Sequence, residues 1–169
     1  PEHGEQYLHR QATDVPSVKM WVDYFINGDV WGADICDFSH LEKENNFIFV
    51  KTDQTYKDKL LEIPQSVCKL RNVADDQLFD IIIDDGSHAS FHQQNTFFTL
   101  FPYLKNGGVF VVEDLQWQPH WDPTRKRIKP FQGNYPDVPK TLSTTAMLRV
   151  MEKALPIISN SNIFSTTRR

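Results

Sequence analysis

Hydrophobic residues gather into short runs along the chain, and the clearest run lies at residues 79–83. One phenylalanine and three isoleucines make up most of it, and such apolar, β-branched runs are typical of a strand buried on both faces of a parallel sheet. Residues 109–112 form a second run, directly after the turn sequence at 106–108. The intervening residues 89–104 are long enough for a crossover helix, so the two runs can form neighbouring parallel strands.

The other patterns along the chain alternate between helix and strand. Val18, Trp21, Val22 and Phe25 recur at helical spacing, which predicts an amphipathic helix. The alternation predicts an α/β fold with a mostly parallel sheet flanked by helices. Further strands are expected at residues 30–35, 47–50 and 162–165, and helices at 16–27, 55–70 (bent or broken at Pro64), 88–104 and 141–155.

The length and composition predict one domain. The chain has 169 residues, of which 40% are hydrophobic and 24% charged, as in an ordinary soluble globular protein with a sizeable core. Residues 1–13 are polar and lack a clear period, so we expect an arm or loop there. Residues 117–138 are rich in aromatic residues and contain four prolines, and we expect a lid-like loop or a disordered segment.

Charge and cysteine content argue against several classes of protein. A net charge of −4 disfavours a general nucleic-acid binder, whose binding face would be basic. The basic run at 125–129 is interpreted as a solvated loop, with binding of an acidic or phosphorylated substrate as the alternative. Two cysteines are too few for a disulfide framework, and neither a membrane span nor a signal peptide is visible. We therefore expect a cytoplasmic protein without a membrane partner.

Acidic residues stand where the predicted strands end. Ligands of α/β sheets bind beyond these carboxyl ends, and neighbouring strands lie only ~4.8 Å apart. Acids crowded there need compensation by a cation, by protonation or by hydrogen bonds. We interpret Asp85, Glu113 and Asp114 as candidate ligands of one Mg²⁺, the alternative being that they cap the following helix and loop. Asp34 suits the ribose hydroxyls of a nucleotide-like cofactor, or else caps a turn.

A histidine follows the first acidic pair. His88 lies at or near a predicted helix start, where the imidazolium form is disfavoured, so it is expected to be neutral and able to accept a proton. A neutral imidazole beside a Lewis acid can act as a general base on an alcohol. The alternative is that His88 only caps the helix. We expect His92 and its neighbours Gln93 and Gln94 to face solvent or the sheet edge, and His120 to be a weaker second base candidate.

Three sequence segments together resemble a known family. DIIIDDGSH, the helix ending QNTFFTLFP, and LKNGGVFVVEDL resemble the metal-dependent sugar O-methyltransferases of macrolide biosynthesis, of the mycinamicin and macrocin type. The resemblance covers roughly residues 17–121 and is strongest over 79–115. It implies a Rossmann-like class I methyltransferase fold, S-adenosylmethionine and Mg²⁺ as cofactors, and an O-methyltransferase of natural product biosynthesis.

The resemblance also implies roles for the metal and the base. Asp85, Glu113 and Asp114 would be the Mg²⁺ ligands, and His88 would be the general base on a sugar hydroxyl. The acceptor would be a glycosylated small molecule, and the protein could form a homo-oligomer.

For the cofactor, the resemblance implies four residues. Asp34 would bind the ribose, Asp53 and Gln54 would lie beside the adenine, and Asp84 would lie near the methionine end.

One part of the family pattern is absent. A glycine-rich turn after a first strand should precede the predicted helix at 16–27, yet the sequence has no glycine between Gly4 and Gly28. Either that strand is missing from this sequence near residues 10–14, leaving residues 1–13 as a remnant, or the protein lacks this half of the cofactor site. The alternatives to an O-methyltransferase are thus a non-catalytic methyltransferase-fold binding module and a metal-dependent hydrolase.

Overall fold

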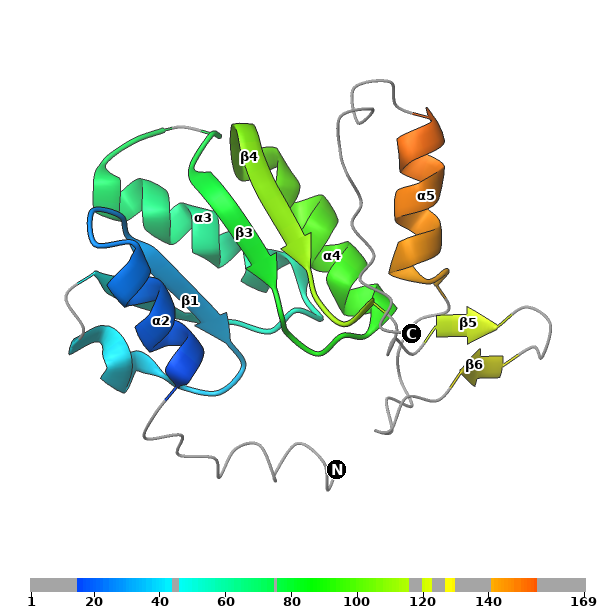
Figure 1. Ribbon diagram of the computed structural model, residues 1–169, viewed down its shortest axis with the longest axis horizontal. Coiled ribbons are helices and arrows are strands. Elements are labelled where there is room, and N and C mark those ends of the chain that lie inside the picture. Colours follow the sequence, from blue (N-terminus) through cyan, green and yellow to red (C-terminus); the bar gives the residue numbers. More distant parts are fainter. Residues whose placement is uncertain are drawn as a thin grey trace.

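Helices and strands alternate along the chain, as the hydrophobic pattern predicts (Figure 1). The computed structural model describes residues 15–43, 46–74, 76–115, 120–122, 127–129 and 141–154. The elements are α2 (Pro16–Tyr24), β1 (Val30–Asp34), η1 (Ser39–Lys43), β2 (Phe47–Lys51), α3 (Lys57–Arg71), β3 (Phe79–Asp84), α4 (Ser90–Leu100), η2 (Phe101–Tyr103), β4 (Leu104–Val112), β5 (His120–Asp122), β6 (Arg127–Lys129) and α5 (Thr144–Ala154).

Two parallel strand pairs form the centre of the fold. β3 pairs with β4, which confirms the expected pair of parallel neighbours, and β1 pairs in parallel with β2. Within the described residues no ladder joins the two pairs, so the single continuous sheet that the sequence predicts is present as two two-stranded sheets. In Figure 1 the arrows of β1, β3 and β4 point the same way, so their carboxyl ends lie toward one side of the molecule.

The main apolar core lies between β3–β4 and the helices α3 and α4. Leu60, Ile63 and Leu100 from the helices are buried there, and Ile82 and Phe110 from the strands pack against them. Alternate side chains of a strand point to opposite faces of its sheet. Ile82 and its ladder partner Phe110 therefore lie on the core side, and the register shift between Phe79 and Ile81 accompanies the packing of Phe79 against the same core.

The opposite face of β3–β4 is not covered by the described residues. Ile81 and Val109 face each other across the ladder and are 42% and 53% exposed. The prediction that both faces of this strand are buried is therefore wrong for the described part of the chain, because α3 and α4 pack on one face alone.

Several element boundaries differ from those predicted. The helix α3 runs unbroken through Pro64, whose buried side chain packs inside the fold, so the predicted break is absent. The helix α4 begins at Ser90, not at His88, and ends at Leu100. A 3₁₀ turn, η2, then leads into β4.

The predicted turn at 106–108 lies inside β4 as a wide bulge. Phe79 pairs with Leu104, and Ile81 pairs with Val109. On β3 only Asp80 lies between these two pairs, whereas on β4 the four residues 105–108 lie between them. Gly107 takes a φ of +82° there, a conformation that glycine adopts without steric cost.

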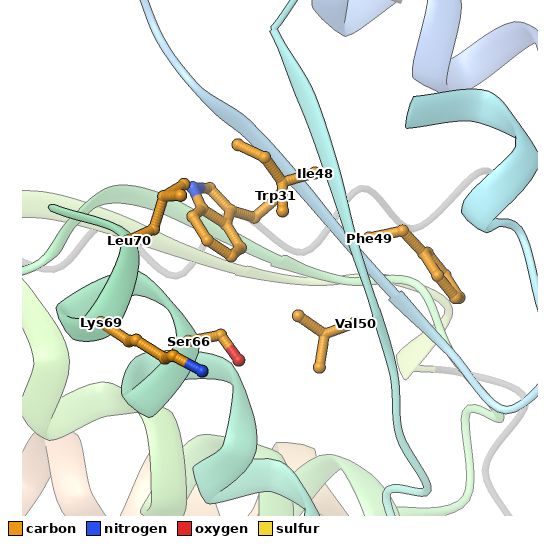
Figure 2. Close-up of a pocket in the computed structure, with 7 residues that line it drawn as sticks. All are labelled: Trp31, Ile48, Phe49, Val50, Ser66, Lys69 and Leu70. Carbon is orange, nitrogen blue, oxygen red and sulfur yellow. The ribbon is translucent and has the colours of Figure 1, made fainter. Parts of the chain in front are cut away.

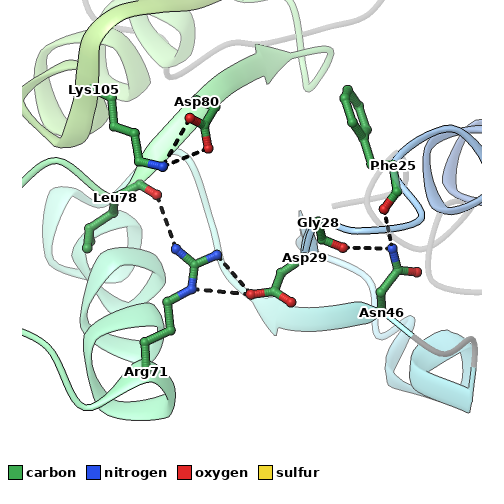
Figure 3. A network of polar contacts seen from close by, with 8 residues as sticks. All are labelled: Phe25, Gly28, Asp29, Asn46, Arg71, Leu78, Asp80 and Lys105. Atoms are coloured by element: carbon green, nitrogen blue, oxygen red, sulfur yellow. Dashed lines mark hydrogen bonds and ion pairs between the residues drawn. The ribbon is translucent and has the colours of Figure 1, made fainter.

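Polar contacts connect the two strand pairs at their amino ends (Figure 3). Arg71, the last residue of α3, donates to the Asp29 carboxylate just before β1 at 2.8 Å and to the Leu78 carbonyl just before β3. Asn46 donates to two backbone carbonyls in the turn after α2, both at 2.8 Å. These contacts lie at the end of the strands away from the acidic residues.

The segment predicted as a lid-like loop contains regular structure. The short strands β5 and β6 pair antiparallel, so residues 117–138 are not wholly irregular. The predicted arm at 1–13 and the predicted strand at 162–165 lie outside the described residues. No helix in the described part of the chain has both the length and the apolar character needed to cross a bilayer.

Candidate functional site

The acidic residues of β3 and β4 meet at the same level of the sheet. Asp84 is paired with Val112 in the parallel ladder, and the backbone N–H of Glu113 donates to the Asp84 carbonyl at 2.9 Å. Asp85 and Glu113 therefore leave the sheet side by side in register. The predicted juxtaposition of the two strand ends is confirmed.

The carboxylates at these strand ends repel one another. The pKa of Glu113 is raised, first by partial burial and then by the negative charges of Asp85 and Asp114. As the side chains stand, no three acidic, histidine or cysteine side chains of the described residues converge into a closed metal site. Carboxylate oxygens nevertheless suit Mg²⁺, which keeps several waters and needs few protein ligands, and a cation would relieve the repulsion at Glu113. The donor set thus fits a hard divalent ion.

His88 and Asp114 face each other across the two strand ends. The Nε2 atom of His88 lies 3.5 Å from an Asp114 carboxylate oxygen. Both residues have left-handed backbones, with φ of 58° and 49°, which costs energy for residues other than glycine and is often found at functional sites. Helix α4 has no side-chain cap, so His88 does not cap it. The Nδ1 atom of His88 is buried and has no hydrogen-bond partner among the described residues.

Asp84 is buried beneath this pair of loops. It is 3% exposed, and burial raises its pKa. One carboxylate oxygen accepts from the Gln54 amide at 2.8 Å and from the Gly86 N–H at 3.2 Å. The other is buried and meets no hydrogen-bond partner within the part of the chain that the structure describes.

Asp34 and Asp53 both cap turns with one carboxylate oxygen. Asp34 accepts from the backbone N–H of Cys36 at 2.7 Å, and Asp53 accepts from that of Thr55 at 2.8 Å. The turn-cap alternative for Asp34 is therefore realised. It uses one of the two carboxylate oxygens of an exposed residue, so a second role in binding hydroxyls is compatible with it.

Polar residues at the start of α4 face inward. Gln93 is fully buried and donates to the Glu113 carbonyl at 2.9 Å. His92 is half-buried and contacts the hydroxyls of Thr55 and Ser87. The expectation that they face solvent or the sheet edge is therefore wrong, because this face of the helix packs on the loops that carry the site.

A sequence signal for these inward-facing residues exists. Gln93, Thr96, Phe97 and Leu100 recur at i, i+3, i+4 and i+7, and all four are buried. Polar residues that share a helix face with core residues are therefore candidates for a buried polar network.

One hollow in the described structure lies away from the strand ends. It has a volume of about 410 Å³ and lies between β1–β2 and α3 (Figure 2). Its walls are mainly apolar, and none of the predicted site residues lines it; Trp31, Ile48, Phe49, Val50, Ser66, Lys69 and Leu70 do. The strand ends, with their convergent polar groups, are therefore the stronger candidate site.

The chain is similar in sequence to several sugar O-methyltransferases. It is 38% identical over 125 residues to 8-demethyl-8-alpha-L-rhamnosyl tetracenomycin-C 2'-O-methyltransferase of Streptomyces olivaceus, covering 74% of this chain and 28% of that protein. It is 39% identical over 105 residues to demethylmacrocin O-methyltransferase of Streptomyces fradiae and 35% identical over 105 residues to mycinamicin VI 2''-O-methyltransferase of Micromonospora griseorubida, in each case covering 62% of this chain and 24% of the relative. The chain thus spans about a quarter of the length of these curated relatives. No protein-family model matches it.

A solved structure has a similar fold. The MycE methyltransferase from the mycinamycin biosynthetic pathway, in complex with Mg, SAH and mycinamycin VI, superposes with a TM-score of 0.59 at 29% identity. The match covers 82% of this chain and 31% of MycE. The α/β arrangement of parallel strands and flanking helices is therefore that of part of a methyltransferase fold.

Proposed function

We propose that this chain, homologous over most of its length to sugar O-methyltransferases of macrolide and tetracenomycin biosynthesis, acts in a Mg²⁺-assisted, S-adenosylmethionine-dependent O-methylation. The acceptor is a hydroxyl of a sugar or of a glycosylated small molecule. The observation that carries the proposal is the placement of Asp85, His88, Glu113 and Asp114 at the carboxyl ends of two adjacent parallel strands, with His88 and Asp114 facing each other. These are the ends at which α/β proteins bind their ligands.

In this proposal Asp85, Glu113 and Asp114 hold the metal. An alcohol with a pKa of about 16 does not attack a methyl group at neutral pH, and a bound cation supplies the missing activation by lowering the pKa of a coordinated hydroxyl. His88 accepts the hydroxyl proton at Nε2. The Asp114 carboxylate, 3.5 Å from that nitrogen, stabilises the resulting imidazolium.

The loops after β1, β2 and β3 form the cofactor side of the proposed site. Asp34 binds the ribose, Asp53 and Gln54 lie at the adenine, and Asp84 lies toward the methionine end. Because the Gln54 side-chain amide is already hydrogen-bonded to Asp84, Gln54 would meet the adenine through its backbone. The buried oxygen of Asp84 that has no partner in the described segments suits a positively charged or hydrogen-bond-donating part of the cofactor.

Binding of S-adenosylhomocysteine tests the proposal directly. Calorimetric titration of the full chain, first with Mg²⁺ and then with EDTA, is expected to give micromolar binding that is stronger with Mg²⁺. Methyl transfer to a panel of glycosylated small molecules, followed by mass spectrometry, then identifies the acceptor class.

A non-catalytic binding module is the second candidate. The absence of glycine between Gly4 and Gly28 favours it, since a glycine-rich turn lets a backbone approach a bound nucleotide closely. No binding of S-adenosylhomocysteine under either condition would support this candidate and contradict the methyltransferase. Hydrolysis of a substrate without the cofactor would instead support a metal-dependent hydrolase.

A further inference from the structure

The loop after β2 and the turn after β3 are joined through the side chain of Gln54. Its amide nitrogen donates to Asp84 at 2.8 Å and to the Thr96 hydroxyl at 3.0 Å. Its amide oxygen accepts from the backbone N–H of Ser87 at 3.1 Å. Both polar atoms of the side chain are therefore used in holding the turn.

Gly86 lets the loop and the turn pack directly on each other. A Cβ atom at Gly86 would overlap the amide group of Gln54. The Asn95 side chain fixes the loop from the other direction, because it donates to the Gln54 carbonyl at 2.6 Å. With no space between the two segments, a displacement of one displaces the other.

His92 forms a second connection between the same two segments. Its Nε2 atom lies 3.2 Å from the Thr55 hydroxyl, and its Nδ1 atom is hydrogen-bonded to the Ser87 hydroxyl. Burial lowers the pKa of His92, so the ring is neutral near pH 7 and has one donor and one acceptor. A hydroxyl can serve either role, so both ring nitrogens are satisfied.

We propose that Gln54 and His92 are positioning residues that couple the cofactor-side loop, Asp53 to Thr55, to the turn that carries Asp85 and His88. The inference rests on the proposed function. Binding of the cofactor against the loop orders the turn through these two side chains, and metal binding at the turn orders the loop in return. Such coupling is reciprocal by thermodynamic necessity.

The test measures the effect of Mg²⁺ on the affinity for S-adenosylhomocysteine by calorimetry. In the wild-type chain Mg²⁺ is expected to raise the affinity by at least about fivefold, the lower range of allosteric coupling. Thr55→Val removes one partner of His92 at nearly constant volume, and Gln54→Met removes all three hydrogen bonds of the amide. Each is expected to reduce the effect of Mg²⁺ to less than about twofold. His92→Gln, whose amide can reach Thr55, is expected to retain more coupling than His92→Phe.

The matched control is Thr99→Val. Thr99 lies on the same helix, is buried, and its hydroxyl has no hydrogen-bond partner among the described residues. Its replacement is expected to leave the coupling at the wild-type value. Hydrogen exchange without ligand gives a second readout: Thr55→Val should speed exchange of the Ser87 amide, which donates to Gln54, without speeding exchange in β4.

The outcomes separate this inference from the proposed function. If the wild-type chain binds no S-adenosylhomocysteine, the proposed function fails and the coupling fails with it. If the wild-type chain binds it and shows coupling, but Thr55→Val and Gln54→Met show the same coupling, only the positioning role is overturned. Binding that is independent of Mg²⁺ in the wild-type chain also overturns the coupling while leaving the cofactor site intact. Circular dichroism checks that each variant is folded. If the other variants are unfolded, Thr55→Val, which is the mildest change, provides the test.

Discussion

At the scale of single residues, the site depends on a few side chains held in costly conformations. His88 and Asp114 both have positive φ, and Asp84 is a buried carboxyl with one oxygen that no described residue hydrogen-bonds. Each feature lowers stability unless the surrounding structure or a ligand compensates for it. Their grouping at one pair of strand ends distinguishes this region from the rest of the described fold.

We expect His88→Ala to reduce methyl transfer by roughly 100-fold or more, because the acceptor hydroxyl loses its general base. The affinity for S-adenosylhomocysteine should not change, since His88 is not among the proposed cofactor residues. Steady-state rates with an identified acceptor, together with calorimetry, measure both quantities. His40→Ala, at an exposed histidine in η1, is the control, and turnover of His88→Ala equal to that of the control would exclude His88 as the base.

The buried His92 should make stability depend on pH. Burial lowers its pKa below the unfolded value of about 6.5, although the nearby charges of Asp53 and Asp84 partly oppose this. The unfolded chain therefore binds more protons than the folded chain, and the stabilisation is present above pH ~6.5 and lost as the pH falls through the folded-state pKa. Urea unfolding between pH 7.5 and 5 is expected to show a smaller loss of stability for His92→Gln than for the wild-type chain. An equal loss in both would mean that His92 does not contribute to the pH dependence.

At the scale of helices and strands, the features that define the candidate site lie mostly at the ends of the strands. The bulge in β4 lets a short 3₁₀ turn lead into a strand that pairs with β3, and Lys105 in the bulge forms an ion pair with Asp80 at 2.9 Å. The bulge therefore sets the register that brings Glu113 level with Asp85. A change of one residue in that register would move the acidic side chains to opposite faces.

Gly107→Ala tests the backbone of the bulge. A Cβ atom at Gly107 would have no neighbour within 4 Å, but the φ of +82° is unfavourable for alanine, so the expected loss of stability is about 1 kcal/mol from backbone strain alone. Gly28→Ala is the matched control, because a Cβ there makes ordinary contacts and the backbone φ is not in the left-handed region. Urea denaturation measures both variants, and equal stability of the two would argue against strain at the bulge.

At the scale of the whole molecule, side chains connect two strand pairs that no described ladder joins. Helices α3 and α4 cover one face, the Arg71 contacts connect the amino ends, and the Gln54 and His92 contacts connect the carboxyl ends. The two ends differ in physical character. At the amino ends the Arg71–Asp29 contact is an exposed ion pair, whereas the carboxyl-end contacts are partly buried hydrogen bonds.

Asp29→Asn tests the amino-end connection. Arg71 and Asp29 are 36% and 43% exposed, so the expected loss in free energy of unfolding is at most about 1 kcal/mol. Because salt screens exposed charges, the difference from the wild-type chain should shrink in high salt. Urea unfolding at low and high salt measures it, and a loss that is large and independent of salt would mean that Asp29 acts through hydrogen bonding instead.

The α/β class and the position of the acidic residues and His88 at the strand ends are predictable from the sequence alone, and so is the possibility that β3 and β4 pair in parallel. These features follow from local hydrophobic periodicity and from chain order, because a strand ends where its apolar run ends. Homology to sugar O-methyltransferases was also visible in the motifs around residues 79–115.

Which polar side chains face inward, and the backbone conformation at the site, depend on tertiary contacts. Gln54 contacts Thr96 across 42 residues and Asp84 across 30, and no local pattern encodes such contacts. The uncovered face of β3–β4 is not encoded locally either. A strand with apolar residues on both faces has the same sequence pattern whether one face or both faces are packed. Burial depends on how distant segments meet, and a polar residue on a helix is placed in the core or in solvent by what packs against that helix.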